Sequence, residues 1–229
     1  MAEASQRLPR PLALLVCLAS LHTALLITST IAGAKLVFLP FHLQASATVL
    51  SYTLTFVILD ALAELYGPQV SRFVINMGLV SMVLSAGYME TAAVLDGPSG
   101  AVQDAFSIIL SMSWRIWIAG WIAYTISQRL DVWSFLLLRR VGGIGASVAA
   151  RAWFSLIFGQ MIDTLLFVTI AFAGTTALLP LITGQYIVKI AISTLTIPLV
   201  SAAVALGKRF LAGTKDADGL IGDTAEELS

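Results

Sequence analysis

Carboxylates, amides and a lysine lie inside runs of apolar residues, where such groups are rare. In the second apolar run, the polar face comprises Thr53, Phe56, Asp60 and Glu64. Their spacing of i, i+3, i+7 and i+11 puts them on one side of a helix. The helical rise places Asp60 roughly 9 Å inside one end of the run. Asp60 either faces a polar site or forms a structural ion pair, and Glu64 either faces that site or lies in interfacial water.

The fifth and sixth apolar runs carry further polar faces. Gln160 and Asp163 share a face at i and i+3, and Asp163 lies roughly 16 Å from the end of its run, close to the middle. The polar face of the sixth run comprises Gln185, Lys189, Ser193 and Thr196. Lys189 either extends to the surface or pairs with Asp163 or Asp60.

The fourth apolar run carries an aromatic and polar stripe. Its members follow at spacings of three and four: Trp114, Trp117, Trp121, Tyr124, Gln128 and Asp131. Trp114 and Trp117, at the outer end, are typical of an aromatic belt at a membrane interface. Trp121 and Tyr124 lie deeper and lead toward Gln128, which predicts an aromatic wall beside hydrogen-bonding groups. Arg115 belongs either to that site or to an outer surface anchor.

Together these faces predict a polar cavity lined by carboxylates, amides, a cation and aromatic rings. Carboxylates accept paired N–H groups, amides serve a carbonyl or a ring nitrogen, and aromatic rings stack on flat faces. The set therefore suits a flat heterocycle with several donors and acceptors. An ion channel is a weaker match, because channels more often repeat identical residues around a symmetric assembly.

Membrane-spanning helices must position these residues. The chain has 229 residues, of which 58% are hydrophobic and 11% charged, whereas soluble domains carry about 25% charged residues. Its mean hydropathy is +0.91, and about 20 apolar residues cross a bilayer as a helix. The predicted spans are 11–32, 45–66, 71–95, 114–138, 152–178 and 181–206, with breaks at Gly67-Pro68 and a bend at Leu179-Pro180. They form an all-α bundle of six transmembrane helices, with an interfacial helix at 103–112. The first run exceeds a signal-peptide core of about 7–15 residues and is expected to be a retained span.

Basic residues predict the orientation. With the N-terminus inside, the inner segments hold ten of them: Arg7, Arg10, Arg72, Arg129, Arg139, Arg140, Arg151, Lys208, Arg209 and Lys215. The outer loops hold Lys35 alone. This bias predicts that both termini are cytoplasmic. Residues 1–10 are expected to form a cytoplasmic segment, 11–206 a six-helix transporter domain, and 207–229 an acidic, disordered cytoplasmic tail.

Several function classes lack their motifs. There is no G-x-x-x-x-G-K-[ST] for ATP hydrolysis and no G-x-S-x-G for catalysis, and His22 and His42 have no metal-ligand neighbours at useful spacing. The single cysteine, Cys17, excludes an intrachain disulfide and is expected to be a packing residue. A net charge of zero argues against nucleic acid as a partner. We therefore expect a protein that is not an enzyme and needs neither a metal nor a cofactor.

Four motifs occur in order along the predicted spans. They are Tyr52-Thr53-Leu54-Thr55-Phe56 through Asp60, Glu64 and Tyr66-Gly67; 126–132; Gln160-Met161-Ile162-Asp163-Thr164; and Gly184-Gln185-Tyr186 with Lys189. This order resembles the queuosine-precursor transporter family, also called the vitamin uptake transporter family. The resemblance implies a six-helix importer, in the bacterial cytoplasmic membrane, of 7-deazaguanine precursors of the tRNA base queuosine, such as 7-cyano-7-deazaguanine.

The resemblance also implies a set of substrate-binding positions. They are Asp60, Glu64, Arg115, Gln128, Asp131, Gln160, Asp163, Gln185 and Lys189, to which the aromatic stripe adds Trp121 and Tyr124. A 7-deazaguanine offers N1–H and an exocyclic amine to a carboxylate, and a carbonyl to an amide or lysine. Three positions depart from the family pattern: Thr53 replaces the usual proline, Gly159 a common serine, and Thr196-Ile197-Pro198 an Asp-Thr-Pro. Loss of that acid leaves the exact cargo and the ion coupling open.

Three functions stay open on the sequence alone. The chain acts by itself as the carrier of a queuosine precursor; it is the substrate-binding membrane subunit of an ATP-driven uptake complex with an ATPase partner; or it is a membrane scaffold whose polar residues only pair helices. The expected partners are a nucleobase-like small molecule and the lipid bilayer. Whether the chain forms a homo-oligomer is left open.

Overall fold

Helices dominate the architecture. The computed structural model describes residues 8–32, 35–38, 44–95, 97, 100–110, 114–140, 147–174 and 177–212. Within these residues the helices are α1 (Arg10–Ala32), α2 (Thr48–Val94), α3 (Ala101–Leu110), α4 (Trp114–Arg140), α5 (Val148–Phe172) and α6 (Leu178–Ala212). Strands β1 (Leu36–Phe38) and β2 (Gln44–Ser46) pair antiparallel, with Leu36 opposite Ser46. The predicted helical bundle is present, but the short strands are an addition, and β2 occupies the start of the predicted second span.

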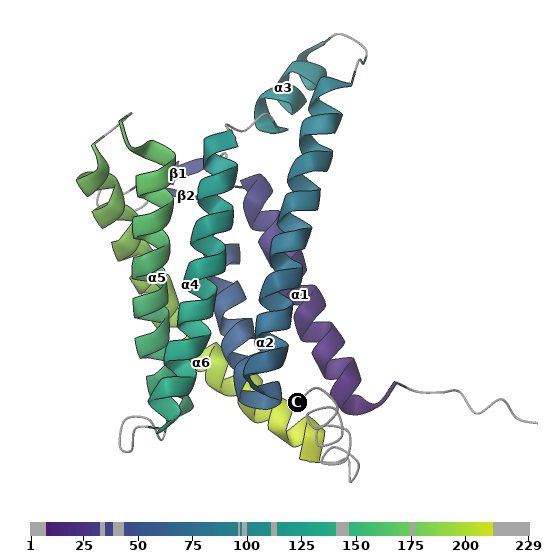
Figure 1. The fold of residues 1–229 in the computed structure, drawn as a ribbon, viewed down its shortest axis with the longest axis vertical. Helices are drawn as coiled ribbons and strands as arrows, with labels where there is room; N and C mark the ends of the chain where they lie inside the picture. Colours follow the sequence, from purple (N-terminus) through teal and green to yellow (C-terminus); the bar gives the residue numbers. More distant parts are fainter. Residues whose placement is uncertain are drawn as a thin grey trace, which may run out of the picture.

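The long helix α2 consists of two helices that meet at Gly67. Its φ of 83° and ψ of 177° lie outside the region that residues with a Cβ adopt readily. Pro68 follows and disfavours a helical conformation of the residue before it. The predicted break at Gly67-Pro68 is therefore confirmed. It separates a first half, residues 48–66, from a second half, residues 68–94, which leads toward α3 (Figure 1).

Three predictions about the ends of the helices need correction. Helix α5 ends at Phe172 and not at 178, because Gly174 takes a φ of 83° and Ala173 N–H donates to the Thr169 carbonyl at 3.0 Å. Pro180 lies in the first turn of α6, where no backbone N–H is needed, so the expected bend at that proline is wrong. The predicted tail begins too early, because 207–212 are the last residues of α6. Residues 1–7 and 213–229 lie outside the described part.

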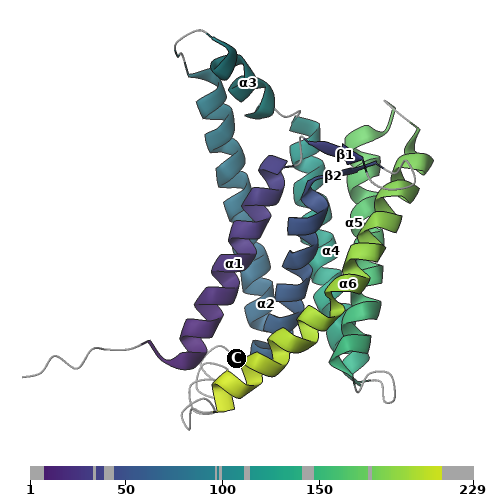
Figure 2. The same ribbon diagram turned by 180° about the vertical axis from the view of Figure 1, so that it is seen from behind.

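The helices pack into one bundle. Helix α1 packs on α2, α4 on α5, and α5 on α6, while α2 also contacts α4 and α6. Their shared core contains Leu26, Phe56, Ile75, Leu156 and Val200. The start of α1 and the end of α6 lie at the same end of the bundle (Figure 2), where the Arg10 guanidinium lies 5.7 Å from the Phe210 ring centroid.

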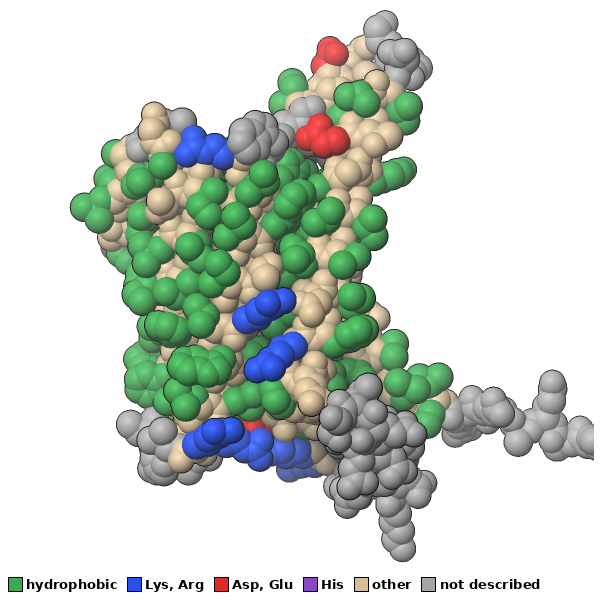
Figure 3. All heavy atoms as spheres, in the orientation of Figure 1, with side chains coloured by type: hydrophobic (Ala, Val, Ile, Leu, Met, Phe, Trp, Pro, Cys, Tyr) green, Lys and Arg blue, Asp and Glu red, His purple; other side chains and the backbone are tan. Residues whose placement is uncertain are grey.

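The outer surface of the bundle is apolar. Large side chains such as Phe73, Leu84 and Leu195 are exposed on it. Lys and Arg side chains gather at the end where α1 starts, and hydrophobic side chains cover much of the face above them (Figure 3). Among the described residues, four helices are long and apolar enough to cross a membrane: Arg10–Ala32, Ser51–Val94, Val148–Phe172 and Leu178–Leu211. The chain is therefore a multi-pass membrane protein.

Candidate functional site

Four helices bring polar side chains together at their common interface. On three of these helices, the residues of this interface, including two phenylalanines and a glycine, follow at a strict spacing of four. They are Tyr52, Phe56, Asp60 and Glu64 on α2; Ser127, Asp131, Phe135 and Arg139 on α4; Arg151, Ser155, Gly159 and Asp163 on α5. Helix α6 adds Lys189 and Lys208. Because residues four apart lie on one helix face, members of equal depth meet in layers. We call these the outer layer, around Asp163, the middle layer, around Asp60 and Asp131, and the inner layer, around Glu64. The inner layer lies at the end of the bundle where α1 starts.

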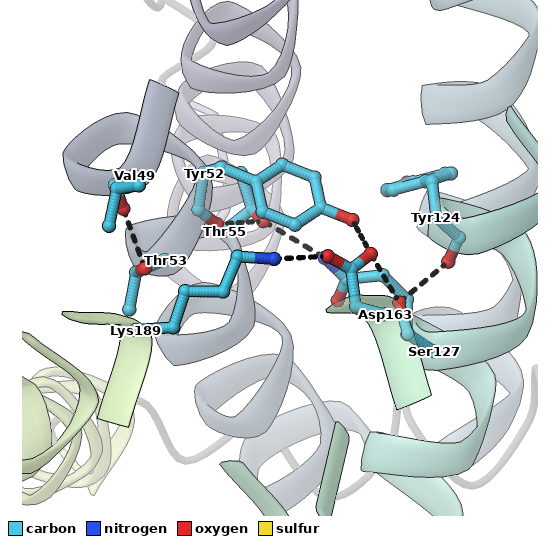
Figure 4. A network of polar contacts seen from close by, with 9 residues as sticks. Val49, Tyr52, Thr53, Thr55, Tyr124, Ser127, Asp163 and Lys189 are labelled. Atoms are coloured by element: carbon cyan, nitrogen blue, oxygen red, sulfur yellow. Dashed lines mark hydrogen bonds and ion pairs between the residues drawn. The ribbon is translucent and has the colours of Figure 1, made fainter. Parts of the chain in front are cut away.

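The outer layer is centred on the buried carboxylate of Asp163. Its Oδ1 accepts hydrogen bonds from the Tyr52 hydroxyl at 2.8 Å and from the Ser127 hydroxyl at 3.2 Å. Its Oδ2 forms an ion pair with Lys189 Nζ at 2.5 Å (Figure 4). Helices α2, α4 and α6 thus each supply a donor to one group on α5. Of the alternatives open for Lys189, the pairing with Asp163 is the one observed.

Buried amides adjoin the outer layer. Gln128 Nε2 donates to the Thr55 hydroxyl at 2.9 Å, and that hydroxyl donates to the Tyr52 carbonyl at 2.6 Å. Gln128 Oε1 and both amide atoms of Gln160 are buried and have no hydrogen-bond partner among the described residues. Gln185 is also buried, one turn before Lys189 on α6. Because buried amide groups are normally hydrogen-bonded, these three amide atoms of Gln128 and Gln160 are exceptions.

The middle layer holds two fully buried carboxylates. Asp60 and Asp131 are each 0% exposed, and Asp60 interacts electrostatically with Asp131. Gly159 permits the close packing around them: a Cβ built on it would lie 3.0 Å from Asp131 Cβ and 3.2 Å from Phe56 Cε1. This contact gives a physical reason for glycine at a position where the resemblance led us to expect serine.

The inner layer is an ion cluster around Glu64. Its carboxylate lies 3.0 Å from Arg151 Nη2, 2.9 Å from Lys208 Nζ and 3.7 Å from Arg139 Nη1. The Arg151 guanidinium also lies 4.8 Å from the Phe135 ring centroid. The cluster joins α2, α4, α5 and α6 at one end of the bundle. The structure thus places Glu64 with these cations and apart from Asp163.

Three other predicted site residues point elsewhere. Arg115 donates from Nε to the Ile170 carbonyl at 2.6 Å and from Nη2 to the Ala173 carbonyl at 2.7 Å, so it binds the carboxyl end of α5. The Tyr124 hydroxyl donates to the Ile75 carbonyl at 3.2 Å and lies 3.1 Å from His22 Nε2. Trp121 packs against the core, with its ring centroid 6.4 Å from that of Trp117. The side chain of Trp114 lies outside what the structure describes.

Sequence reasoning missed several residues of these layers. Tyr52, Thr55, Ser127, Arg151 and Ser155 were not among the predicted site residues, although each contacts or adjoins one of them. The signal that could have found most of them is the four-residue spacing. Extending it from Asp60, Asp131 and Asp163 reaches four of the five.

Comparison with known proteins adds the family. The family described as "Putative vitamin uptake transporter" matches residues 46–203, which is more than half of the chain. The chain belongs to this family. A relative from Bacillus subtilis (strain 168), named "Probable queuosine precursor transporter", is 26% identical over 167 residues, covering 71% of this chain and 73% of the relative. No solved structure matches.

Membership of the vitamin uptake transporter family decides the broad function. The family and the relative are both described as transporters and neither as an enzyme, so this chain is a membrane transporter. The resemblance drawn from the four sequence motifs is thereby confirmed. The matched range contains the outer and middle layers entirely, and it omits only Lys208 from the inner layer.

Proposed function

We propose that this transporter imports a queuosine precursor, 7-cyano-7-deazaguanine or a related 7-deazaguanine, and binds it at the outer layer. The observation that carries the proposal is the Asp163 carboxylate, buried and reached by donors from three other helices. The name of the Bacillus subtilis relative supports the class of substrate. Because four helices contribute to this site, binding of the substrate can alter how all four pack.

The outer layer supplies groups that complement a 7-deazaguanine. The N1–H and exocyclic amine of the base can both donate to the Asp163 carboxylate, which accepts paired N–H groups. Lys189 would then leave the ion pair and donate to the carbonyl of the base. Gln128 Oε1 and the Gln160 amide, which have no partner among the described residues, can serve the remaining polar edge. The Tyr52 ring, with Lys189 Nζ 5.6 Å from its centroid, adjoins this position.

The membrane topology belongs to the same proposal. Helices α1, α4, α5 and α6 and the two halves of α2 cross the bacterial cytoplasmic membrane, which makes six crossings. Both termini then face the cytoplasm. The gathering of Lys and Arg at the end where α1 starts supports this orientation (Figure 3).

The chain works as a carrier on its own in this proposal. Neither the family description nor the name of the Bacillus subtilis relative refers to an ATP-driven complex. Copurification from a native membrane distinguishes the alternatives, because a subunit of such a complex brings an ATPase with it and a lone carrier does not.

The queuosine content of tRNA in a deficient bacterial strain tests the function. The chain is expressed in a bacterial strain that neither makes queuosine precursors nor imports them, and 7-cyano-7-deazaguanine is supplied at low concentration. We expect queuosine to reappear in tRNA, to disappear with Asp163→Asn, and to persist with Cys17→Ala. The Cys17 side chain is exposed on α1, so the expectation that it is a packing residue is wrong. Absence of queuosine despite membrane expression of the unaltered chain would contradict the proposal.

A further inference from the structure

The aspartate pair of the middle layer differs from the other buried acids. None of the carboxylate oxygens of Asp60 and Asp131 has a hydrogen-bond partner among the described residues. By contrast, Asp163 is paired with Lys189, and Glu64 is surrounded by cations. The pair comes from α2 and α4, is 0% exposed, and interacts across the helix interface.

Two neighbouring carboxylates shielded from water cannot both carry a charge at low cost, and sharing one proton relieves the repulsion. Apart from Arg151, the groups around the pair do not replace that proton. Ser155 lies near both acids, but its hydroxyl donates to the Ala152 carbonyl at 3.2 Å. From α1, His22 is engaged with Tyr124. From α6, Lys208 reaches Glu64 one turn farther along α2.

Arg151 is a second, independent feature of this site. Its side chain is 4% exposed, and its Nη2 lies 3.0 Å from Glu64. Its Nε and Nη1 are buried without a partner among the described residues, while the guanidinium interacts with Asp60. These N–H groups can donate hydrogen bonds to a carboxylate of the pair once that carboxylate is charged. Such a move would draw Arg151 away from Glu64 and loosen the inner layer.

We propose that Asp60 and Asp131 form a proton-binding site and that this proton enters the cell together with the substrate. A proton from outside bonds to a carboxylate oxygen of one aspartate, and the resulting O–H donates a hydrogen bond to the carboxylate of the other. On the cytoplasmic side it leaves for water, the pair gains one negative charge, and Arg151 neutralises that charge. The inference rests on the proposed import function and adds its energy source. Sodium fits the site less well, because the cationic Arg151 adjoins the same carboxylates.

Transport in liposomes tests the coupling. The purified full chain is reconstituted, the membrane potential is clamped at zero, and uptake of radiolabelled 7-cyano-7-deazaguanine is followed with the lumen one pH unit more alkaline than the medium. One proton per neutral molecule supports an accumulation of up to about tenfold. We expect this accumulation to vanish with a protonophore and to be unaffected by replacing sodium.

Substitutions assign the proton to the pair. Asp60→Asn and Asp131→Asn should abolish accumulation driven by the pH gradient but retain counterflow, in which unlabelled substrate inside exchanges for labelled substrate outside. The matched control Asp104→Asn, at an exposed position on α3, should keep both. Retained counterflow also shows that the variants fold. If a variant does not fold, the gradient experiment on the wild-type protein still decides whether transport is coupled to protons.

Three outcomes would overturn the inference. The first is accumulation driven by a sodium gradient in place of the pH gradient. The second is full pH-driven accumulation in the asparagine variants, and the third is wild-type counterflow without any response to pH. In each of these the import function stands and only the proton site is lost. Absence of wild-type counterflow would overturn the import function and the inference together.

Discussion

The carboxylate of Asp163 ties four helices together at one depth. Its three donors come from α2, α4 and α6, so a change in this one group alters the packing of helices that are distant in sequence. An ion pair buried to this extent is costly to break, because the remaining partner is left as an uncompensated charge. Under the proposed function, Asp163 serves both stability and transport, and substitutions can separate the two roles.

Removing one member of this ion pair should destabilise the protein, while removing both should not. Asp163→Asn or Lys189→Met alone should each lower the free energy of unfolding by about 3–5 kcal/mol. The double variant should recover most of that loss, yet remain inactive in uptake, because the substrate loses its acceptor. Unfolding in detergent and tRNA queuosine content measure the two effects. A double variant as unstable as the single ones would contradict this account of the pair.

Gly159 is predicted to be intolerant of any side chain. A Cβ there would lie 3.0 Å from Asp131 Cβ and 3.2 Å from its Oδ1, both tighter than ordinary contacts. Gly159→Ala should therefore lower the free energy of unfolding by about 1–3 kcal/mol. Gly120→Ala on α4 is the matched control, since nothing lies within 4 Å of its Cβ position, and it should be neutral or stabilising by up to about 1 kcal/mol. Equal effects in the two variants would show that the contact around Gly159 relaxes freely.

At the residue scale, the sequence located the costly groups but not their partners. Charge inside an apolar run singled out Asp60, Asp163 and Lys189, because burial without compensation is unfavourable whatever the fold. Neutral donors such as Tyr52 and Ser127 gave no such signal. Which of two acids pairs with Lys189 depends on how α5 and α6 are aligned along their axes, and this alignment is not encoded in the spacing within either helix.

At the scale of elements, the break in α2 is what allows two antiparallel halves. Because Gly67 adopts a φ of 83° with a ψ of 177°, the chain leaves the helix and re-enters it at Pro68. Glycine and proline interrupt a helix through their local backbone preferences, so this break could be predicted from the sequence. The end of α5 was predicted too late because the apolar run continues past Gly174, and hydropathy alone does not report a helix cap.

Replacing Gly67 should weaken the fold through the backbone alone. Nothing lies within 4 Å of its Cβ position, so Gly67→Ala causes no clash. The conformation itself costs a residue with a Cβ about 1–3 kcal/mol, and we expect thermal unfolding in detergent at a correspondingly lower temperature. Gly87→Ala, in the second half of α2 and with equally open surroundings, is the control. If both variants unfold at the same temperature, backbone strain at Gly67 is not what shapes α2.

At the scale of the whole molecule, the layers form a polar column through an apolar bundle. The outer layer holds the Asp163–Lys189 ion pair, the middle layer the buried carboxylates of Asp60 and Asp131, and the inner layer the ion cluster at the end where α1 starts. This order could not be read from sequence, because it depends on α5 running opposite to α4 and α6. Hydropathy could predict the apolar helices, since it reflects interactions with the bilayer and not with neighbouring helices. The orientation that the basic residues indicate stays a prediction.

The orientation predicts which cysteines can be labelled from outside the cell. In a Cys17→Ala background, Lys35→Cys adds a thiol beside β1, and Arg140→Cys adds one at the end of α4, both at exposed positions. With both termini cytoplasmic, a membrane-impermeant maleimide should label the first variant in intact cells and the second only after permeabilisation. The reversed pattern would place the inner layer on the outer face of the membrane. Import would then begin at the Glu64 cluster, and the proton would meet that cluster before it reached Asp60 and Asp131, so this labelling also fixes the direction in which the column is used.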